Sequence, residues 1–138
     1  MANIIPDAFK SELLSGTHNF ANGGNTFKIA LFTDISGYST SSTTYSTTNE
    51  VSSSGTSYTA GGNALDSQAV SVASNTALVD FADEVFSSVT LSAVGAVIYN
   101  STNSDKIVVV LDFGGTKTAT NGDFTIQFPA AGASTAII

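Results

Sequence analysis

His18 is the side chain best suited to acid–base chemistry, because it is the only histidine in a chain without cysteine. Histidine titrates near neutral pH and serves as the base of Ser-His-Asp triads. His18, however, stands in Thr17-His18-Asn19 just after a helical pattern, and the chain contains no Gly-x-Ser-x-Gly elbow. We therefore expect His18 to cap or bond a loop, and we expect no catalytic residues and no enzyme activity.

The densest acidic cluster consists of Asp80, Asp83 and Glu84. Carboxylate oxygens at such short spacing can hold Ca²⁺, but the segment lacks the Asp-x-Asn-x-Asp-Gly pattern of a dedicated calcium loop. None of the glycine pairs opens a helix that could hold phosphate. The sequence thus predicts a solvated turn at this cluster, and neither a metal nor a cofactor.

Tyr38, Tyr45 and Tyr58 are spaced through the Ser- and Thr-rich stretch 35–62. Aromatic side chains on polar loops can stack on sugars or anchor protein contacts. They can equally pin the loop to its own domain. Because a structureless stretch this long is unusual in a compact domain, it is either a functional excursion or the site of one or two edge strands.

One short helix is expected near the N-terminus. Pro6 suits a first helical turn, Asp7 complements the positive end of the helix dipole, and Gly16 suits the C-terminal cap. Phe9 and Leu13 stand four residues apart on one face. A helix of about ten residues is marginal alone. It must therefore dock, either over one end of the β core or onto a neighbouring subunit.

The rest of the chain has the pattern of β-strands. Residues 27–32 alternate, with the odd-numbered apolar side chains on one face. Residues 70–72 and 77–81 alternate on either side of Ser74-Asn75, which is a tight-turn signal. These two runs therefore predict a β-hairpin.

A second hairpin is predicted from residues 89–99 and 106–113, joined by the polar turn cluster 100–105. The run 107–111 is apolar on both faces, which indicates a central strand of a packed sandwich. The glycine pair 114–115 is expected to end this strand, because paired glycines suit a strand end that needs positive φ.

A turn signal at 121–123 leads into a last predicted strand, 124–128. About seven to eight short strands with turn signals fit a β-sandwich or jelly roll. Helices do not alternate with strands, which excludes the doubly wound α/β folds. The chain length fits one domain, 1–138, with an N-terminal helical segment at 1–20 and an excursion at 35–62.

Charge scarcity restricts the possible partners. The chain has four Lys and no Arg against eleven carboxylates, and its net charge is −7. Nucleic acids and anionic membranes are both bound through Lys and Arg, so neither is expected as a partner. The N-terminus lacks the basic region and long apolar run of a secretory signal. We therefore expect assembly in a cytoplasm without an export step.

Seven stretches carry a likeness that covers nearly the whole chain. They are residues 9–19, 27–33, 45–51, 58–62, 95–100, 110–114 and 121–129. On these stretches the sequence resembles a group of small virion structural proteins from tailed phages of marine and freshwater bacteria. The resemblance implies a capsid decoration, or cement, protein on the capsid surface, assembled in the host cytoplasm. The alternative is a tail- or fibre-associated module that binds a host receptor or glycan.

As a cement protein, the chain would bind the major capsid protein and itself, in a closed homotrimer over quasi-three-fold junctions of the shell. A charge-poor surface permits the large apolar contact that this needs. The apolar tail 130–138 is expected to be covered by a neighbouring copy, although burial in its own sandwich would also satisfy it. The expected protein-contact residues are Phe9, Leu13, Tyr38, Tyr45, Tyr58, Ile137 and Ile138.

Overall fold

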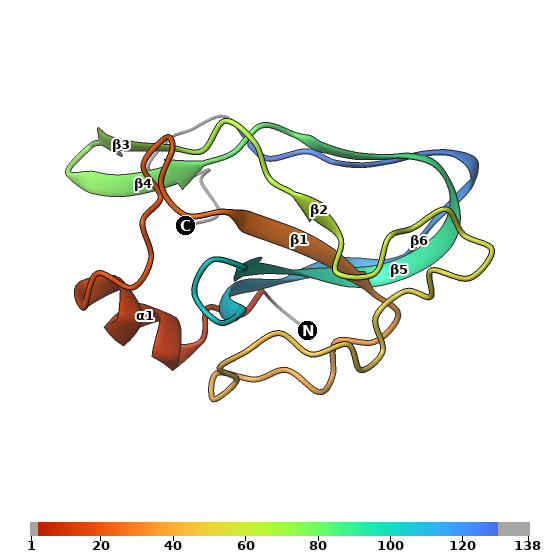
Figure 1. Ribbon diagram of the computed structural model, residues 1–138, viewed down its shortest axis with the longest axis horizontal. Helices are drawn as coiled ribbons and strands as arrows, with labels where there is room; N and C mark the ends of the chain where they lie inside the picture. The colour runs from red at the N-terminus through yellow and green to blue at the C-terminus, as the bar shows by residue number, and fades with distance from the viewer. Residues whose placement is uncertain (1–2, 130–138) are drawn as a thin grey trace.

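The computed structural model describes residues 3–129, which form one short helix and six β-strands (Figure 1). Four strands form an antiparallel sheet in the order β2-β1-β5-β6, and β3 pairs with β4 in a separate hairpin. The predicted all-β, sandwich-like class with one short helix is therefore confirmed. The elements are α1 (Asp7–Leu14), β1 (Phe27–Phe32), β2 (Asn63–Ala64), β3 (Ala69–Ala73), β4 (Thr76–Asp80), β5 (Glu84–Asn100) and β6 (Lys106–Ile126).

Two strands, β5 and β6, are much longer than the sequence predicted, and together they build both layers of the fold. They pair with each other as one long antiparallel hairpin. Halfway along it, Val94 of β5 lies opposite the four residues 113–116 of β6. Such a bulge bends a ladder, and the hairpin turns back over itself at this point (Figure 1). The main hydrophobic core lies between the two halves.

The glycines that were expected to end a strand lie inside this bulge instead. Gly114 has φ +76° and Gly115 has φ +159°, so the chain bends there while the ladder continues. A second bulge includes Asn121, with φ +46°, where the sequence predicted a turn. The predicted strand end at 114–115 and the predicted turn at 121–123 were both wrong, because β5 supplies hydrogen-bond partners on either side of each site.

The apolar run 107–111 lies on an edge strand of the sheet and not on a central one, which corrects a second prediction. The run is nevertheless buried, because the N-terminal segment covers the edge of β6. The N–H of Ile4 donates to the Val110 carbonyl, and the N–H of Val110 donates to the Ile4 carbonyl, both at 2.8 Å. The hydrophobic pattern therefore predicted burial on both faces correctly, but not the position in the sheet.

Strand β1 is buried on both faces and separates two apolar clusters. Ile29 and Leu31 belong to the main core between the layers, as the alternation predicted. Ala30 and Phe32 belong to a smaller cluster on the other face. The excursion 35–62 covers that second face and contains no strand; β2 begins directly after it. The alternative of one or two edge strands within this stretch is therefore not observed.

Helix α1 covers one end of the core, which was the first of its two expected roles, and its C-terminal end is as predicted. Gly16 follows the helix with φ +76°. The Gly16 N–H donates to the Leu13 carbonyl at 3.3 Å, and the Thr17 N–H donates to the Glu12 carbonyl at 2.9 Å. These are the two bonds of a Schellman cap.

The predicted hairpin at 70–81 is also present, as β3 and β4. Ser74 and Asn75 have φ +49° and +64°, the conformation of a two-residue type I′ turn. The hairpin is not part of the main sheet. In Figure 1 the hairpin lies at the same end of the molecule as α1, above the helix in the view.

Candidate functional site

The structure gathers three tyrosines around Glu50. Tyr45 donates to Glu50 Oε2 at 2.6 Å, and Tyr58 donates to Oε1 at 2.7 Å. The Gly61 N–H also donates to Oε1, at 2.6 Å. Tyr99 stacks on Tyr45 with ring centroids 4.3 Å apart, and its hydroxyl donates to the Gly61 carbonyl. Glu50 thus accepts three short hydrogen bonds. Hydrogen bonds to a charged carboxylate are stronger than those between neutral groups, so these contacts hold the segment firmly in place.

The environment of these phenols keeps them protonated. Burial, and then the hydrogen bond to Glu50, raise the pKa of Tyr45 and of Tyr58 well above the ordinary value. Burial also raises the pKa of Tyr99 to about 12. At neutral pH these side chains therefore act as hydrogen-bond donors and not as proton acceptors.

The tyrosines thereby pin the excursion to the chain's own sandwich. Tyr58 is 3% exposed and accepts a hydrogen bond from the Leu31 N–H at 3.0 Å. Tyr38 packs edge-on against Phe32, with ring centroids 5.5 Å apart. Tyr38 and Tyr45 are half-buried. As contact residues for a partner, Tyr38 and Tyr45 keep some surface, whereas Tyr58 offers none.

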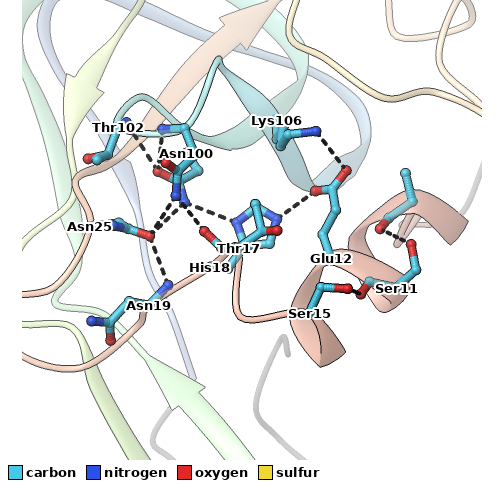
Figure 2. A network of polar contacts seen from close by, with 12 residues as sticks. Ser11, Glu12, Ser15, Thr17, His18, Asn19, Asn25, Asn100, Thr102 and Lys106 are labelled. Carbon is cyan, nitrogen blue, oxygen red and sulfur yellow. Dashed lines mark hydrogen bonds and ion pairs between the residues drawn. The ribbon is translucent and has the colours of Figure 1, made fainter.

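His18 lies at the centre of a second buried network (Figure 2). Its Nδ1 is 3.0 Å from Asn100 Nδ2, and its Nε2 is 2.8 Å from Glu12 Oε2. Because an amide nitrogen can only donate, Nδ1 accepts, and Nε2 carries the hydrogen that Glu12 accepts. Asn100 also donates to Asn25 Oδ1, and Lys106 Nζ lies 3.4 Å from Glu12 Oε1.

This network joins α1, the loop that follows it and the turn between β5 and β6. The side chain of His18 has no exposed surface. Its ring packs 5.0 Å from the ring of Phe9, between centroids. The contacts of His18 are thus internal, as expected for a histidine that bonds a loop.

The acidic cluster is also used in internal contacts. Asp83 Oδ1 accepts from the Phe128 N–H, and Glu84 Oε1 accepts from Asn63 Nδ2, both at 2.8 Å. Among residues 3–129, no three His, Asp or Glu side chains are grouped so that they could hold a metal ion. In the same part of the chain, the helix is too short to cross a membrane.

The contact residues predicted on the helix lie in different environments. Phe9 is 2% exposed and belongs to the main core, so it offers no surface to a partner, contrary to the prediction. Leu13 is 43% exposed. Ile137 and Ile138 lie outside the described residues.

Helix α1 and strand β3, which lie at the same end of the molecule (Figure 1), carry four exposed apolar side chains, of which only Leu13 was predicted as a contact residue. Leu14 of α1 is 90% exposed, and Val70 and Val72 of β3 are 56% and 73% exposed. Leu13 and Val70 line the same groove between α1 and the β3–β4 hairpin. We call Leu13, Leu14, Val70 and Val72 the apolar end. The sequence signal that could have indicated the exposed valines is their alternation in β3, a strand without any charged residue.

Glu50 and Asn100 were missed as well, and no sequence signal marks them. Glu50 is one carboxylate in a Ser- and Thr-rich stretch, and Asn100 is one polar residue in a turn cluster. Asn100 meets His18 from 82 positions away. Only the packing of distant segments shows that these two residues organise the buried networks.

No family model matches the chain, and neither does any curated protein or solved structure.

Proposed function

We propose that this protein is a structural protein of a phage virion, a capsid decoration protein that binds the shell of the major capsid protein and stabilises it. The observation that carries the proposal is the apolar end, where four large apolar side chains are exposed on a charge-poor β body. Clustered exposed apolar side chains mark protein contact sites. The resemblance of the sequence to small virion proteins supplies the partner.

The anchoring of the loops supports a passive mechanical role. The excursion is tied through Glu50, and the N-terminal segment is tied through His18 and Asn100. A body with ordered loops loses little conformational entropy when it binds, so more of the contact energy stabilises the complex. A protein that binds the assembled shell better than its separate subunits stabilises the lattice by mass action.

The proposed assembly is a closed homotrimer over a quasi-three-fold junction of the shell. Cyclic closure leaves no unpaired copy of the interface, which limits further growth. Light scattering on the purified protein should give the mass of a trimer. A monomer at every concentration, and also in the particle, would reject this part of the proposal.

The decisive experiment compares particles that carry the protein with particles stripped of it. Stripped particles should release their DNA at a lower temperature, and adding back the protein should restore the original temperature. The double variant Leu14→Ser/Val72→Ser should fail to restore it. Val85→Ser is the matched control, because Val85 is 41% exposed and lies outside the apolar end.

Salt provides a second measurement on the same particles. The apolar end contains no charged residue, so binding should weaken only modestly between low and high salt. A steep loss of binding with salt would point to a charged interface elsewhere on the protein.

A hollow beside Tyr38 favours the alternative, a tail- or fibre-associated module that binds a host receptor or glycan. The hollow has a volume of about 250 Å³ and is lined by Asp34, Tyr38, Thr48 and Asn49, among others. An aromatic face beside hydrogen-bonding groups suits a sugar ring. A copy number near that of the shell subunits supports the capsid role. Stripped particles that keep their heat resistance but no longer attach to cells would support the alternative.

A further inference from the structure

Strand β3 has a free edge, and the register of the hairpin identifies its unpaired backbone groups. The strand pairs with β4 alone, and Ala73 lies opposite Thr76 on either side of the two-residue turn. In such a hairpin this pair exchanges both hydrogen bonds, and hydrogen-bonded and non-hydrogen-bonded pairs then alternate along the ladder. Val72, opposite Ala77, and Val70 two residues before it therefore take non-hydrogen-bonded positions. The N–H and C=O groups of both valines point away from β4.

Nothing on the strand itself protects this edge against pairing. Within residues 3–129, no other segment forms a backbone hydrogen bond with these four groups. Natural edge strands are commonly protected by a charged residue, a proline or a bulge. Strand β3 contains no charged residue and no proline, its register with β4 is unbroken, and four of its five residues are exposed. The edge thus presents two donors and two acceptors at the spacing that an added strand uses.

The side chains beside this edge favour an apolar partner. Val70 and Val72 are two residues apart, so they project from one face of the strand, and both are exposed. Val70 also lines a groove of about 560 Å³ between α1 and the hairpin, together with Leu13 and Leu78. Neighbouring side chains on one face of a ladder lie about 5 Å apart across the strands. Apolar side chains at alternate positions of an added strand would therefore cover the valines and reach the groove.

Charge around the hairpin excludes an acidic partner segment. Residues 63–105, which include the hairpin, contain five carboxylates and no Lys or Arg. One of these carboxylates, Asp80, lies opposite Ala69 at the open end of the hairpin. Like charges placed opposite each other across a ladder are destabilising. The edge therefore fits an extended, apolar segment without carboxylates.

We propose that an extended strand of the shell subunit pairs with the free edge of β3 and extends the hairpin to three strands. This inference rests on the proposed function and specifies how the apolar end is bound. Only an extended backbone can bond to N–H and C=O groups at this two-residue spacing, because the backbone groups of a helix are already bonded within the helix. A second copy is not the occupant, since pairing β3 with β3 gives a two-fold contact and a closed three-fold ring contains none.

Hydrogen exchange, measured on stripped particles to which the protein has been added back, tests the pairing. In the free protein, the amides of Val70 and Val72 should exchange faster than those of Ser71 and Ala73, which donate to β4. On the particle, the two valine amides should slow by at least about tenfold, because they then donate to the added strand. Bound protein whose valine amides exchange as fast as in the free protein would overturn this inference and leave the capsid role standing. Protein that does not bind the particle would overturn both.

Three substitutions separate backbone pairing from side-chain contact. Val72→Pro removes one outward N–H but keeps an apolar side chain, whereas Val72→Ala keeps the N–H and removes most of the side chain. Strand pairing predicts that Val72→Pro weakens binding to stripped particles by about tenfold, and by more than Val72→Ala does. Ala77→Pro is the control for a proline in the hairpin, because the Ala77 N–H points away from β3, and its binding should be unchanged. A larger loss in Val72→Ala than in Val72→Pro, or equal losses in the two proline variants, would reject pairing at this edge.

Discussion

The excursion 35–62 and the β3–β4 hairpin differ in the side chains that each of them buries. The excursion is polar and irregular, yet its tyrosines and Glu50 tie it to the sheet through buried contacts. The hairpin is regular and follows a good turn signal, yet its strand β3 projects Val70 and Val72 into water, while β4 contacts the core through Leu78 and Val79. Regular backbone hydrogen bonding and attachment to the core are therefore separate properties.

The physical reason lies in what each segment buries. A two-stranded hairpin is marginal in water without further packing. In the excursion, each buried phenol removes apolar ring surface from water while its hydroxyl keeps a partner, so no polar group is lost. A few such side chains hold an irregular segment more firmly than an alternating strand that faces solvent.

Among single substitutions in the two segments, Glu50→Ala should cause the largest loss in the free energy of unfolding. The change removes the carboxylate that accepts three hydrogen bonds, so the hydroxyls of Tyr45 and Tyr58 lose their acceptor. We expect the free energy of unfolding to fall by about 2–4 kcal/mol. Denaturant titration would measure the loss.

Asp66→Ala is the control for Glu50→Ala, because it removes one carboxylate from an exposed site. The free energy of unfolding should change by no more than about 0.5 kcal/mol. Similar losses in both variants would mean that net charge, and not the tie at Glu50, determines the result.

Alkaline pH should loosen the excursion next. The pKa of Tyr58 is raised in the folded state above its ordinary value of 10.0, so the folded protein binds this proton more tightly than the unfolded chain does. The stabilisation is complete below pH 10 and is lost as pH rises toward the folded pKa. Between pH 10 and the folded pKa, stability should fall by about 1.4 kcal/mol per pH unit for each tyrosine that stays protonated only in the folded state.

Tyr58→Phe isolates one tyrosine in this titration. It keeps the ring but removes the ionisable hydroxyl. The fall of the free energy of unfolding with pH above pH 10 should therefore become less steep by the contribution of one tyrosine. At neutral pH the variant should lose about 1–2 kcal/mol, because Glu50 and the Leu31 N–H each lose a partner. An unchanged alkaline slope would show that Tyr58 ionises with an ordinary pKa.

The smallest effect is expected in the hairpin, from Val72→Thr. Threonine keeps the β-branched shape that strands favour, and Val72 is already 73% exposed. The free energy of unfolding should stay within about 0.5 kcal/mol of the original. A loss as large as that of Glu50→Ala would contradict the contrast between the two regions.

Features that depend on a few neighbouring residues could be predicted from the sequence alone. Gly16 ends the helix and Ser74-Asn75 turns the first hairpin, because each needs only a local backbone conformation. The polar cluster 100–105 turns the second hairpin for the same reason. The β class, the alternating inner face of β1 and the loop-bonding role of His18 also followed from the sequence.

Tertiary structure decided the rest. The glycine pair 114–115 could end a strand or bend it, and the outcome depended on whether β5 continued alongside. The burial of 107–111 depended on Ile4 covering an edge, and the role of Asn100 depended on His18 arriving from 82 positions away. Local preferences are settled within a few residues of the chain. Contacts between distant segments determine the strand register, the segments that cover a sheet edge and the partners of buried hydrogen bonds. These contacts exist only once the chain has folded.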